Sequence, residues 1–389
     1  MTPADSPSAG SPAAGATPPA GYVAALAGFE RMTSARLSSL LSGRSPADAF
    51  SVAAGELRPP APIASLFQRD PALAASWRVD ATRRPADEVW QRCVEVGVSV
   101  VLPGDSAFPP QLLDDPRRPA VLFVRGDLDV LDARRVGIVG TRNATQRGRE
   151  TAARFGHELS NAGVVVVSGL AKGIDGAAHR GALAVADAHP VAVVGSGLDR
   201  PYPVQHAELW EAVAERGALV SEWPPGTAPD AFRFPLRNRI LAALVEVLVV
   251  VESRERGGSL ITAREAAERG VEVFAVPGPV RSRASMGTNR LLCDGAAPAT
   301  EVADVLMALG LDGRRAGRSR FDPRPRPDAD GLVFVSACRT AARSIEELAV
   351  ESGRSVVDVA LSVARLEHAG WLRETGGWFE AIDEWADLA

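Results

Sequence analysis

The chain has 389 residues and a formal net charge of −5, from 43 basic and 48 acidic residues. This length suits about two or three domains, and the negative balance excludes a polybasic coat for nucleic acid, so any affinity for a polyanion must come from a local patch. Aromatic residues make up only 5% of the chain, which limits extended stacking on bases, and no apolar run reaches transmembrane length.

The first part of the chain divides into an N-terminal segment with few bulky apolar residues and a helical segment. Residues 1–20 are Pro, Ala, Ser, Gly and Thr with almost no bulky apolar side chain. They cannot offset the entropy of ordering and are predicted to be disordered, and they lack the features of a secretion signal. Apolar residues then recur at helical spacing, at Val23 and Leu26 and at Leu37 and Leu40. This pattern predicts a small helical domain over residues 21–80.

Residues 81–310 start with a short strand-rich connector and continue with apolar runs that alternate with helical stretches. The predicted strands span residues 136–139, 164–167, 191–194, 218–221, 245–251 and 271–276, and helices are predicted over 146–162, from 175, and over 204–216. The apolar runs are continuous, as in strands that are covered on both faces. Strands that alternate with helices indicate an α/β fold with a doubly wound, mostly parallel sheet.

Lys172 is the only lysine of the chain, and it lies in a glycine-bracketed loop between a predicted strand and a predicted helix. The backbone N–H groups of such a loop and the start of the following helix add positive potential, so a cation there can hold an anion. A solvated loop lysine is the alternative if this loop stands alone. Four other connections share its character, however, and each offers glycine, hydroxyl or cation; the five span residues 140–145, 168–173, 195–203, 232–239 and 252–259.

These five connections are expected at one edge of the sheet, because right-handed crossovers bring all strand-to-helix loops to the same side. Their convergence predicts a groove lined for phosphate. The groove does not match a dinucleotide site, because the first strand lacks the G-x-G-x-x-G spacing, nor a P-loop, because Lys172 precedes Gly173 and not Ser or Thr. Asp175 and His179 share one helix face, and we interpret them as a helix cap and a packed histidine.

The three cysteines, Cys93, Cys293 and Cys338, are far apart and form no zinc spacing. They are expected to be buried apolar residues, and free cysteines suit a reducing cytoplasm. The predicted groove thus has anion holders without an evident reactive group, and no cofactor or metal is expected. This pattern favours binding of a single nucleic-acid strand, in which cations follow the phosphates and flat groups stack on bases.

The candidate cations are Arg142, Arg233, Arg237, Arg239, Arg254 and Arg256, since guanidinium both pairs and stacks. Phe232, Phe234 and Tyr202 are candidate stacking platforms, and ordinary core packing has equal weight for each phenylalanine.

Six motifs in order resemble the DNA-processing protein A (DprA/Smf) family. They are GIVGTRNAT (137–145), VSGLAKGIDGAAH (167–179), VGSGLDRPYP (194–203), FPLRNRI (234–240), GGSLITA (257–263) and AVPG (275–278), and together they cover roughly residues 105–300. The resemblance implies an extended Rossmann-like domain that binds single-stranded DNA without reading sequence. It also implies a cytoplasmic, non-enzymatic homodimer that protects incoming DNA in natural transformation and loads the recombinase RecA.

The family's pocket positions carry over to Arg142, Ser168, Gly169, Lys172, Gly257, Gly258 and Ser259, with Arg237 and Arg239 beside them. With Arg233, Asn238 and Arg256 these form the expected DNA-binding set. One position departs from the pattern, because Val204 stands where some relatives have a basic residue; Arg200 and Arg233 are candidates to compensate. Relatives often begin with a SAM or helix-hairpin-helix-like module, but the hairpin's Gly-x-Gly turn is absent from residues 21–80.

Residues 313–327 combine Pro, Gly and six arginines without bulky aliphatic side chains, which predicts a flexible basic linker over residues 311–329. The linker either adds phosphate contacts or is a solvated tether. Residues 330–389 follow with a helix capped by Ser344, an amphipathic helix over 355–367 and a hairpin around Gly376 and Gly377, which indicates a winged-helix domain. The second of these helices carries Arg365 as its only cation within 355–367, so a protein-contact or structural role is favoured over groove reading.

Two other functions are alternatives to single-strand binding. A phosphoribohydrolase-type enzyme would share the sheet but needs a catalytic glutamate in a P-G-G-x-G-T-x-x-E loop, and residues 256–263 have none at that place. A scaffold that binds a protein through the winged helix, with a vestigial groove, is the third interpretation.

Overall fold

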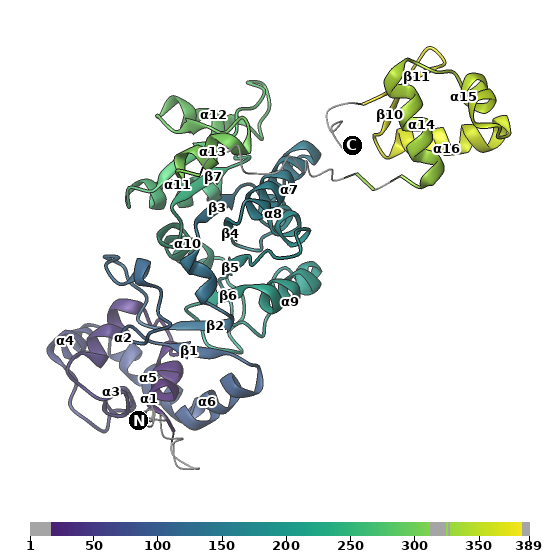
Figure 1. Ribbon diagram of the computed structural model, residues 1–389. Coiled ribbons are helices and arrows are strands. Elements are labelled where there is room, and N and C mark those ends of the chain that lie inside the picture. Colours follow the sequence, from purple (N-terminus) through teal and green to yellow (C-terminus); the bar gives the residue numbers. More distant parts are fainter. Residues whose placement is uncertain (1–16, 312–323, 326, 383–389) are drawn as a thin grey trace, which may run out of the picture. The chain divides into compact units, whose positions relative to one another are not determined.

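The computed structural model describes residues 17–311, 324–325 and 327–382. The described residues fall into two compact units, and the division between the units lies between residues 315 and 316 (Figure 1). Of the first twenty residues, only 17–20 are described, and helix α1 (Pro19–Ala27) already begins at Pro19. Proline suits this first helical position, because its φ is preset and its missing N–H would have no partner there. The expectation of disorder is therefore wrong for residues 19–20, and residues 1–16 lie outside the described part.

The first unit is built on a nine-stranded sheet within the described ranges, in the order β1-β2-β6-β5-β4-β3-β7-β8-β9. The seven strands from β3 to β9 run parallel to one another. Strands β1 and β2 pair antiparallel and form one edge of the sheet. The strands are β1 (Ser99–Val101), β2 (Leu122–Gly126), β3 (Arg135–Val139), β4 (Val165–Ser168), β5 (Val191–Val193), β6 (Ala218–Ser221), β7 (Val247–Val250), β8 (Glu272–Ala275) and β9 (Ala297–Pro298). The predicted α/β fold with a mostly parallel sheet is confirmed.

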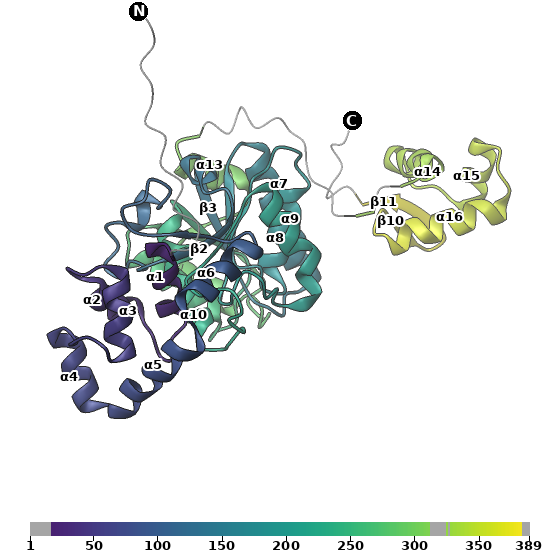
Figure 2. The same ribbon diagram turned by 90° about the horizontal axis from the view of Figure 1, so that it is seen from below.

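Helices cover both faces of this sheet, which explains why its strands are apolar without alternation. Val165 and Val167 of β4 pack in the cluster that contains Leu241 of α10, whereas the equally buried Val166 points to the side of α7 and α8. Figure 2 shows α7, α8 and α9 together along one side. The helices are α7 (Gln146–Asn161), α8 (Ile174–Leu183), α9 (Ala207–Arg216), α10 (Arg233–Leu244), α11 (Gly258–Ala267), α12 (Met286–Cys293) and α13 (Val302–Ala308).

The sheet reverses its winding at β3. The chain moves from β3 through β4 and β5 to β6 on one side, then returns to β7 on the other side of β3. The connections after β3 and β7 therefore lead away from each other and leave a crevice at the carboxyl ends of the strands, where ligands of such folds bind.

Residues 232–239, predicted as a loop, are helical from Arg233 onward, because α10 begins there. Pro235 argued for a loop, since the residue before a proline is steered away from helical conformation. It occupies the third helical position, however, where a backbone N–H has no partner within the helix in any case. Burial of Ile240, Leu241 and Leu244 against the sheet then stabilises the helix, at about 1.5–3 kcal/mol for each side chain.

From residue 17 onward, six helices precede the sheet and lie at its β1–β2 edge (Figure 1). Besides α1 they are α2 (Ser34–Leu41), α3 (Pro46–Ala54), α4 (Ala61–Arg69), α5 (Pro71–Arg83) and α6 (Ala86–Glu95). Three of them begin with a side-chain cap, from Thr33, Ser45 and Asp70. Trp77 is fully buried among them, and its indole N–H donates to the Glu30 carbonyl at 2.9 Å. Because α6 packs against α1, the helical packing continues past residue 80.

The second unit contains α14 (Ala329–Thr340), α15 (Ile345–Ser352), α16 (Val356–His368) and the hairpin β10 (Leu372–Thr375) and β11 (Trp378–Ala381). Ser344 and Glu347 form the predicted capping box, and both turn glycines, Gly376 and Gly377, have positive φ. Helices α15 and α16 and the hairpin lie where the sequence predicted them, whereas α14 was not predicted. The winged-helix interpretation stays a prediction.

Most of the predicted linker lies outside the described residues, but its end is packed against the second unit. The Arg324 guanidinium lies 3.6 Å from the centre of the Trp371 ring and donates to the Gly370 carbonyl at 2.8 Å. Trp371 in turn donates its indole N–H to the Pro325 carbonyl at 2.9 Å. The prediction of a flexible tether is thus wrong for Arg324 and Pro325, because they form part of the folded unit.

Candidate nucleic-acid interface

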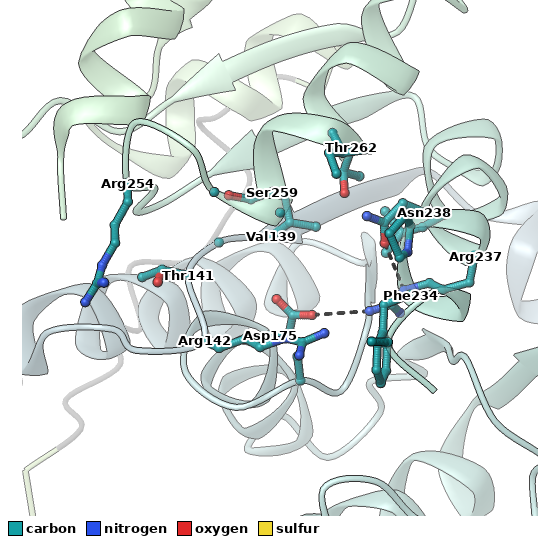
Figure 3. A pocket seen from close by; sticks show the side chains of 18 of the residues that line it. Val139, Thr141, Arg142, Asp175, Phe234, Arg237, Asn238, Arg254, Ser259 and Thr262 are labelled. Carbon is teal, nitrogen blue, oxygen red and sulfur yellow. Dashed lines mark hydrogen bonds and ion pairs between the residues drawn. The ribbon is translucent and has the colours of Figure 1, made fainter. Parts of the chain in front are cut away.

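A pocket of about 500 Å³ opens at the carboxyl ends of the strands, at the reversal point between β3 and β7 (Figure 3). All five connections singled out in the sequence contribute to its lining. The polar and aromatic residues in that lining are Thr141, Arg142, Asp175, Tyr202, Asp230, Phe234, Arg237, Asn238, Arg254, Arg256, Ser259 and Thr262. The predicted convergence of these loops is therefore present in the structure.

Three exposed arginines stand at the pocket, from the loops after β3 and β7: Arg142, Arg254 and Arg256. The Arg142 guanidinium lies 4.5 Å from the centre of the Phe234 ring, which stacks at a tilt on Tyr202 with ring centres 5.5 Å apart. Arg254 lies across the pocket from Phe234 (Figure 3). An aromatic layer and exposed guanidinium groups thus share one opening, as single-strand binding requires.

The floor of the pocket is a buried ion pair. Arg237 is 4% exposed, and its Nη2 lies 3.8 Å from Oδ2 of the buried Asp175. The guanidinium also donates to the Val193 carbonyl and, from Nε, to Oδ1 of Asn238 at 3.0 Å. Burial lowers the pKa of Arg237 to about 10, and burial raises the pKa of the Asp175 carboxyl although Arg237 opposes this. Arg237 is thus held by protein groups at the floor.

Asp175 is not the helix cap expected from the sequence. The residue at the start of α8 is Gly173, and no side chain caps this helix. The Asp175 carboxylate instead accepts the backbone N–H groups of Ala171 and Gly140 and faces Arg237. His179 is packed as expected: it is fully buried, with Nε2 3.2 Å from the Val191 carbonyl oxygen, and burial lowers its pKa to about 4.

Helix α11 points its N-terminus at the pocket. Gly257 is the residue before its first turn, no side chain caps it, and Gly257, Gly258 and Ser259 all line the pocket. The Ser259 hydroxyl donates to the Ser253 hydroxyl at 2.9 Å. Because the first backbone N–H groups of a helix have no intrahelical partner and carry the positive end of its dipole, this end is suited to an anion.

A buried carboxylate fixes the loop that carries Arg142. Glu252, two residues after the end of β7, accepts from the backbone N–H of Thr145 at 2.9 Å and from its hydroxyl at 2.5 Å. The Glu252 carbonyl accepts from the Thr141 N–H at 2.8 Å. A side chain at Gly148 would overlap the Glu252 carboxylate. The loops after β3 and β7 are therefore held together as one piece.

Five of the twelve expected DNA-binding residues do not line the pocket: Ser168, Gly169, Lys172, Arg233 and Arg239. Ser168 is buried and donates its hydroxyl to the Ile138 carbonyl at 2.5 Å. Gly169 lies against the Arg237 guanidinium so closely that a Cβ there would overlap it. Lys172 is exposed and directly follows Ala171, which lines the pocket.

The other two are arginines that other groups engage. Arg239 pairs with Glu222, and both side chains are 11% exposed. Arg233 donates to the Ala228 carbonyl. The structure thus brings Arg142, Arg237, Asn238, Arg256, Gly257, Gly258 and Ser259 together at the pocket.

Sequence reasoning did not assign Thr141, Asp230 and Thr262 to the site, although each lines the pocket. Thr141 and Thr262 lie inside the motifs at 137–145 and 257–263, so their nearness in sequence to Arg142 and Ser259 could have indicated them. No sequence pattern pointed to Asp230. Cys93 and Cys338 are buried as expected, and burial raises the pKa of each thiol to about 11. Cys293 is exposed at the end of α12, so that expectation is wrong.

Across the described ranges, no group of three or more His, Cys, Asp or Glu side chains is placed to hold a metal ion. None of the helices in the described parts of the chain has the length and apolarity that a membrane crossing requires.

Residues 99–310, more than half of the chain, match the family model described as DNA recombination-mediator protein A. The chain belongs to this family. Protein Smf of Escherichia coli (strain K12) is 37% identical over 286 residues, which cover 72% of this chain and 76% of that protein. The match places the pocket inside the part of the chain that defines the DNA recombination-mediator protein A family.

Two solved structures of family members resemble the fold. The X-ray structure of DNA processing protein A from Streptococcus pneumoniae has a TM-score of 0.61 at 31% identity and covers 74% of this chain and 95% of that one. DNA processing protein A from Helicobacter pylori has a TM-score of 0.50 at 27% identity, over 55% of this chain and 95% of that one. The Helicobacter pylori protein has a single-stranded DNA binding mode that is described as unique.

Proposed function

We propose that this protein binds single-stranded DNA without reading its sequence, with the pocket at the β3–β7 reversal as the main contact. The observation that carries the proposal is the combination at one opening of three exposed arginines, a Tyr202–Phe234 stack and the uncapped N-terminus of α11. Guanidinium groups and free N–H groups bind phosphate wherever it occurs along a strand, and aromatic faces accept any base.

The chemistry of the pocket favours binding over turnover. Asp175 is the buried carboxylate in the lining, and Arg237 and two backbone N–H groups engage it. The first turn of α11 carries no acidic residue, whereas a phosphoribohydrolase needs a glutamate in the comparable loop. We therefore favour a non-enzymatic role, and turnover of nucleoside monophosphates by the purified protein would restore the enzyme hypothesis.

Membership of the recombination-mediator family supports a wider proposal. The protein acts as a homodimer in the cytoplasm, protects single strands during natural transformation, and loads RecA onto them. A dimer would join two short footprints on one strand and raise affinity by avidity. Two findings support this proposal: the family is one of DNA recombination mediators, and its Helicobacter pylori member binds single-stranded DNA.

The test is a binding titration of oligothymidine and of a matched duplex at several salt concentrations. For the single strand, log affinity is expected to fall with log salt at about −0.7 for each phosphate neutralised. Arg142→Ala and Lys172→Ala are expected to weaken binding to all single-strand sequences alike. Normal binding by both variants would refute the assignment of the groove.

A further inference from the structure

Beside the pocket, the connection between β6 and α10 presents an aromatic and cationic surface. Asp230 and Ala231 line the pocket, and Phe232 and Arg233 follow them directly in the chain. The Phe232 side chain is 56% exposed. The Arg233 guanidinium lies 4.9 Å from the centre of the Phe232 ring and 5.9 Å from that of Trp223. We call Trp223, Phe232 and Arg233 the platform.

The helical segment places a second arginine at the platform. Arg84 follows the last residue of α5 and is exposed. Its Nη1 lies 3.2 Å from the point where a Cβ of Gly28 would stand, and Cγ of Pro224 lies 3.1 Å from the same point. Arg84 and Pro224, the neighbour of Trp223, thus both border Gly28, the residue that follows α1.

The two guanidinium groups carry like charges beside the same Trp223–Pro224 segment. Burial lowers the pKa of Arg233, Asp230 opposes this, and Arg84 lowers the pKa further by like-charge repulsion. The Arg233 Nε is buried without a hydrogen-bond partner. Two neighbouring cations repel each other, and a phosphate placed near both relieves this repulsion. The exposed Phe232 ring provides a face for a base.

We propose that Arg84 and the platform form a second contact for the same single DNA strand, which leaves the pocket over Phe232 toward the helical segment. This inference rests on the proposed function and gives the N-terminal helices a direct part in it. The strand's phosphates are the shared partner of Arg84 and Arg233, and the platform rings stack on bases. The contact lengthens the footprint of one protomer beyond the pocket.

The experiment compares Arg84→Ala with Arg83→Ala, its matched control. Arg83 is the preceding residue, is also exposed, and ends α5. On a long oligothymidine, Arg84→Ala is expected to lose affinity about tenfold, the effect of one charge-assisted hydrogen bond. The slope of log affinity against log salt should also become shallower by about 0.7. A short oligothymidine that fills only the pocket should bind both variants as it binds the wild type.

Photo-crosslinking of the wild-type chain to an oligonucleotide with 5-iodouracil gives an independent readout that no substitution can disturb. Crosslinks on Trp223 or Phe232 are expected. If Arg84→Ala and Arg83→Ala bind the long strand equally well, or if crosslinks avoid the platform, the second contact is refuted while the pocket assignment stands. If the wild type binds no single strand at all, the proposed function fails first.

Discussion

At the scale of single residues, Arg142 is the cation whose side chain is best positioned to bind a DNA strand. Its guanidinium is exposed and already stacked on Phe234, so little side-chain entropy is lost on binding. Arg142→Ala is expected to weaken binding of oligothymidine about tenfold. Arg147→Ala is the matched control, because Arg147 is exposed on the first turn of α7, close in sequence to the same loop. Equal losses in both variants would point to general electrostatics and not to a specific contact.

Arg237 is expected to contribute mainly to the stability of the fold and less to direct contact with DNA. Removing one partner of a buried ion pair leaves an uncompensated charge, which costs about 3–5 kcal/mol. Arg237→Met should therefore lower the free energy of unfolding by about that amount in urea titrations, and the double variant with Asp175→Asn should recover part of the loss. An Arg237→Met variant of normal stability that binds no DNA would show that this side chain contacts the strand directly.

His179 makes stability depend on pH. Burial lowers its pKa to about 4, below the ordinary value of 6.5, so the unfolded chain binds more protons between these two values and stability falls as pH decreases through that window. The loss amounts to at most about 3 kcal/mol at pH 4. His157 and His206 have lowered pKa values through burial as well and act in the same direction.

His179→Gln should flatten this slope in urea titrations between pH 7 and pH 4, because glutamine keeps a donor for the Val191 carbonyl and carries no titrating group. An unchanged slope would mean that the unfolding transition does not include the β4–α8 region.

At the scale of elements, the site depends on two loops joined through Glu252. Glu252→Ala removes the acceptor for the Thr145 N–H and hydroxyl, and a hydrogen bond to a charged group contributes about 1.5–3 kcal/mol. The variant should melt at lower temperature and bind single strands more weakly, because the loop of Arg142 is released. Glu255→Ala removes an exposed carboxylate from the same connection. It should lower neither the melting temperature nor the affinity for single strands. Normal melting and binding by Glu252→Ala would contradict the role of this carboxylate.

The strands of the sheet and the helices between them could be predicted because residues close in sequence determine them. The runs around Val166 and Val249 are apolar without interruption, and the helices between them carry their own caps, such as Thr145. Helix α10 could not be predicted from its first turn, because the helix there depends on burial of later residues such as Ile240 against the sheet. Its start lies where proline and two phenylalanines give a loop-like local signal.

The same limit applies to the candidate site. Which loops converge follows from topology, so Arg142, Arg256 and Gly257 could be placed from the sequence. Whether an arginine in those loops is free for a ligand depends on partners distant in the chain, as with Arg239 and its partner Glu222. No local pattern shows such a pairing.

At the scale of the whole molecule, the first compact unit is expected to bind DNA and the second to bind a protein partner. The first unit contains the pocket and the platform, whereas α16 of the second exposes Val357 and Leu361 by 68% and 60%. An apolar helix face suits a protein partner better than a DNA groove. A chain ending at residue 315 should therefore bind oligothymidine with unchanged affinity and salt slope. Loss of all binding on this truncation would place the main DNA contact in the second unit.

Single-strand binding at the pocket is tested most sharply by a crystal structure of the protein with oligothymidine. We expect phosphates at Arg142 and at the N-terminus of α11, with a base near the Tyr202–Phe234 stack and the Asp175–Arg237 pair intact beneath it. A strand bound elsewhere, with this opening empty, would contradict the assignment of the pocket.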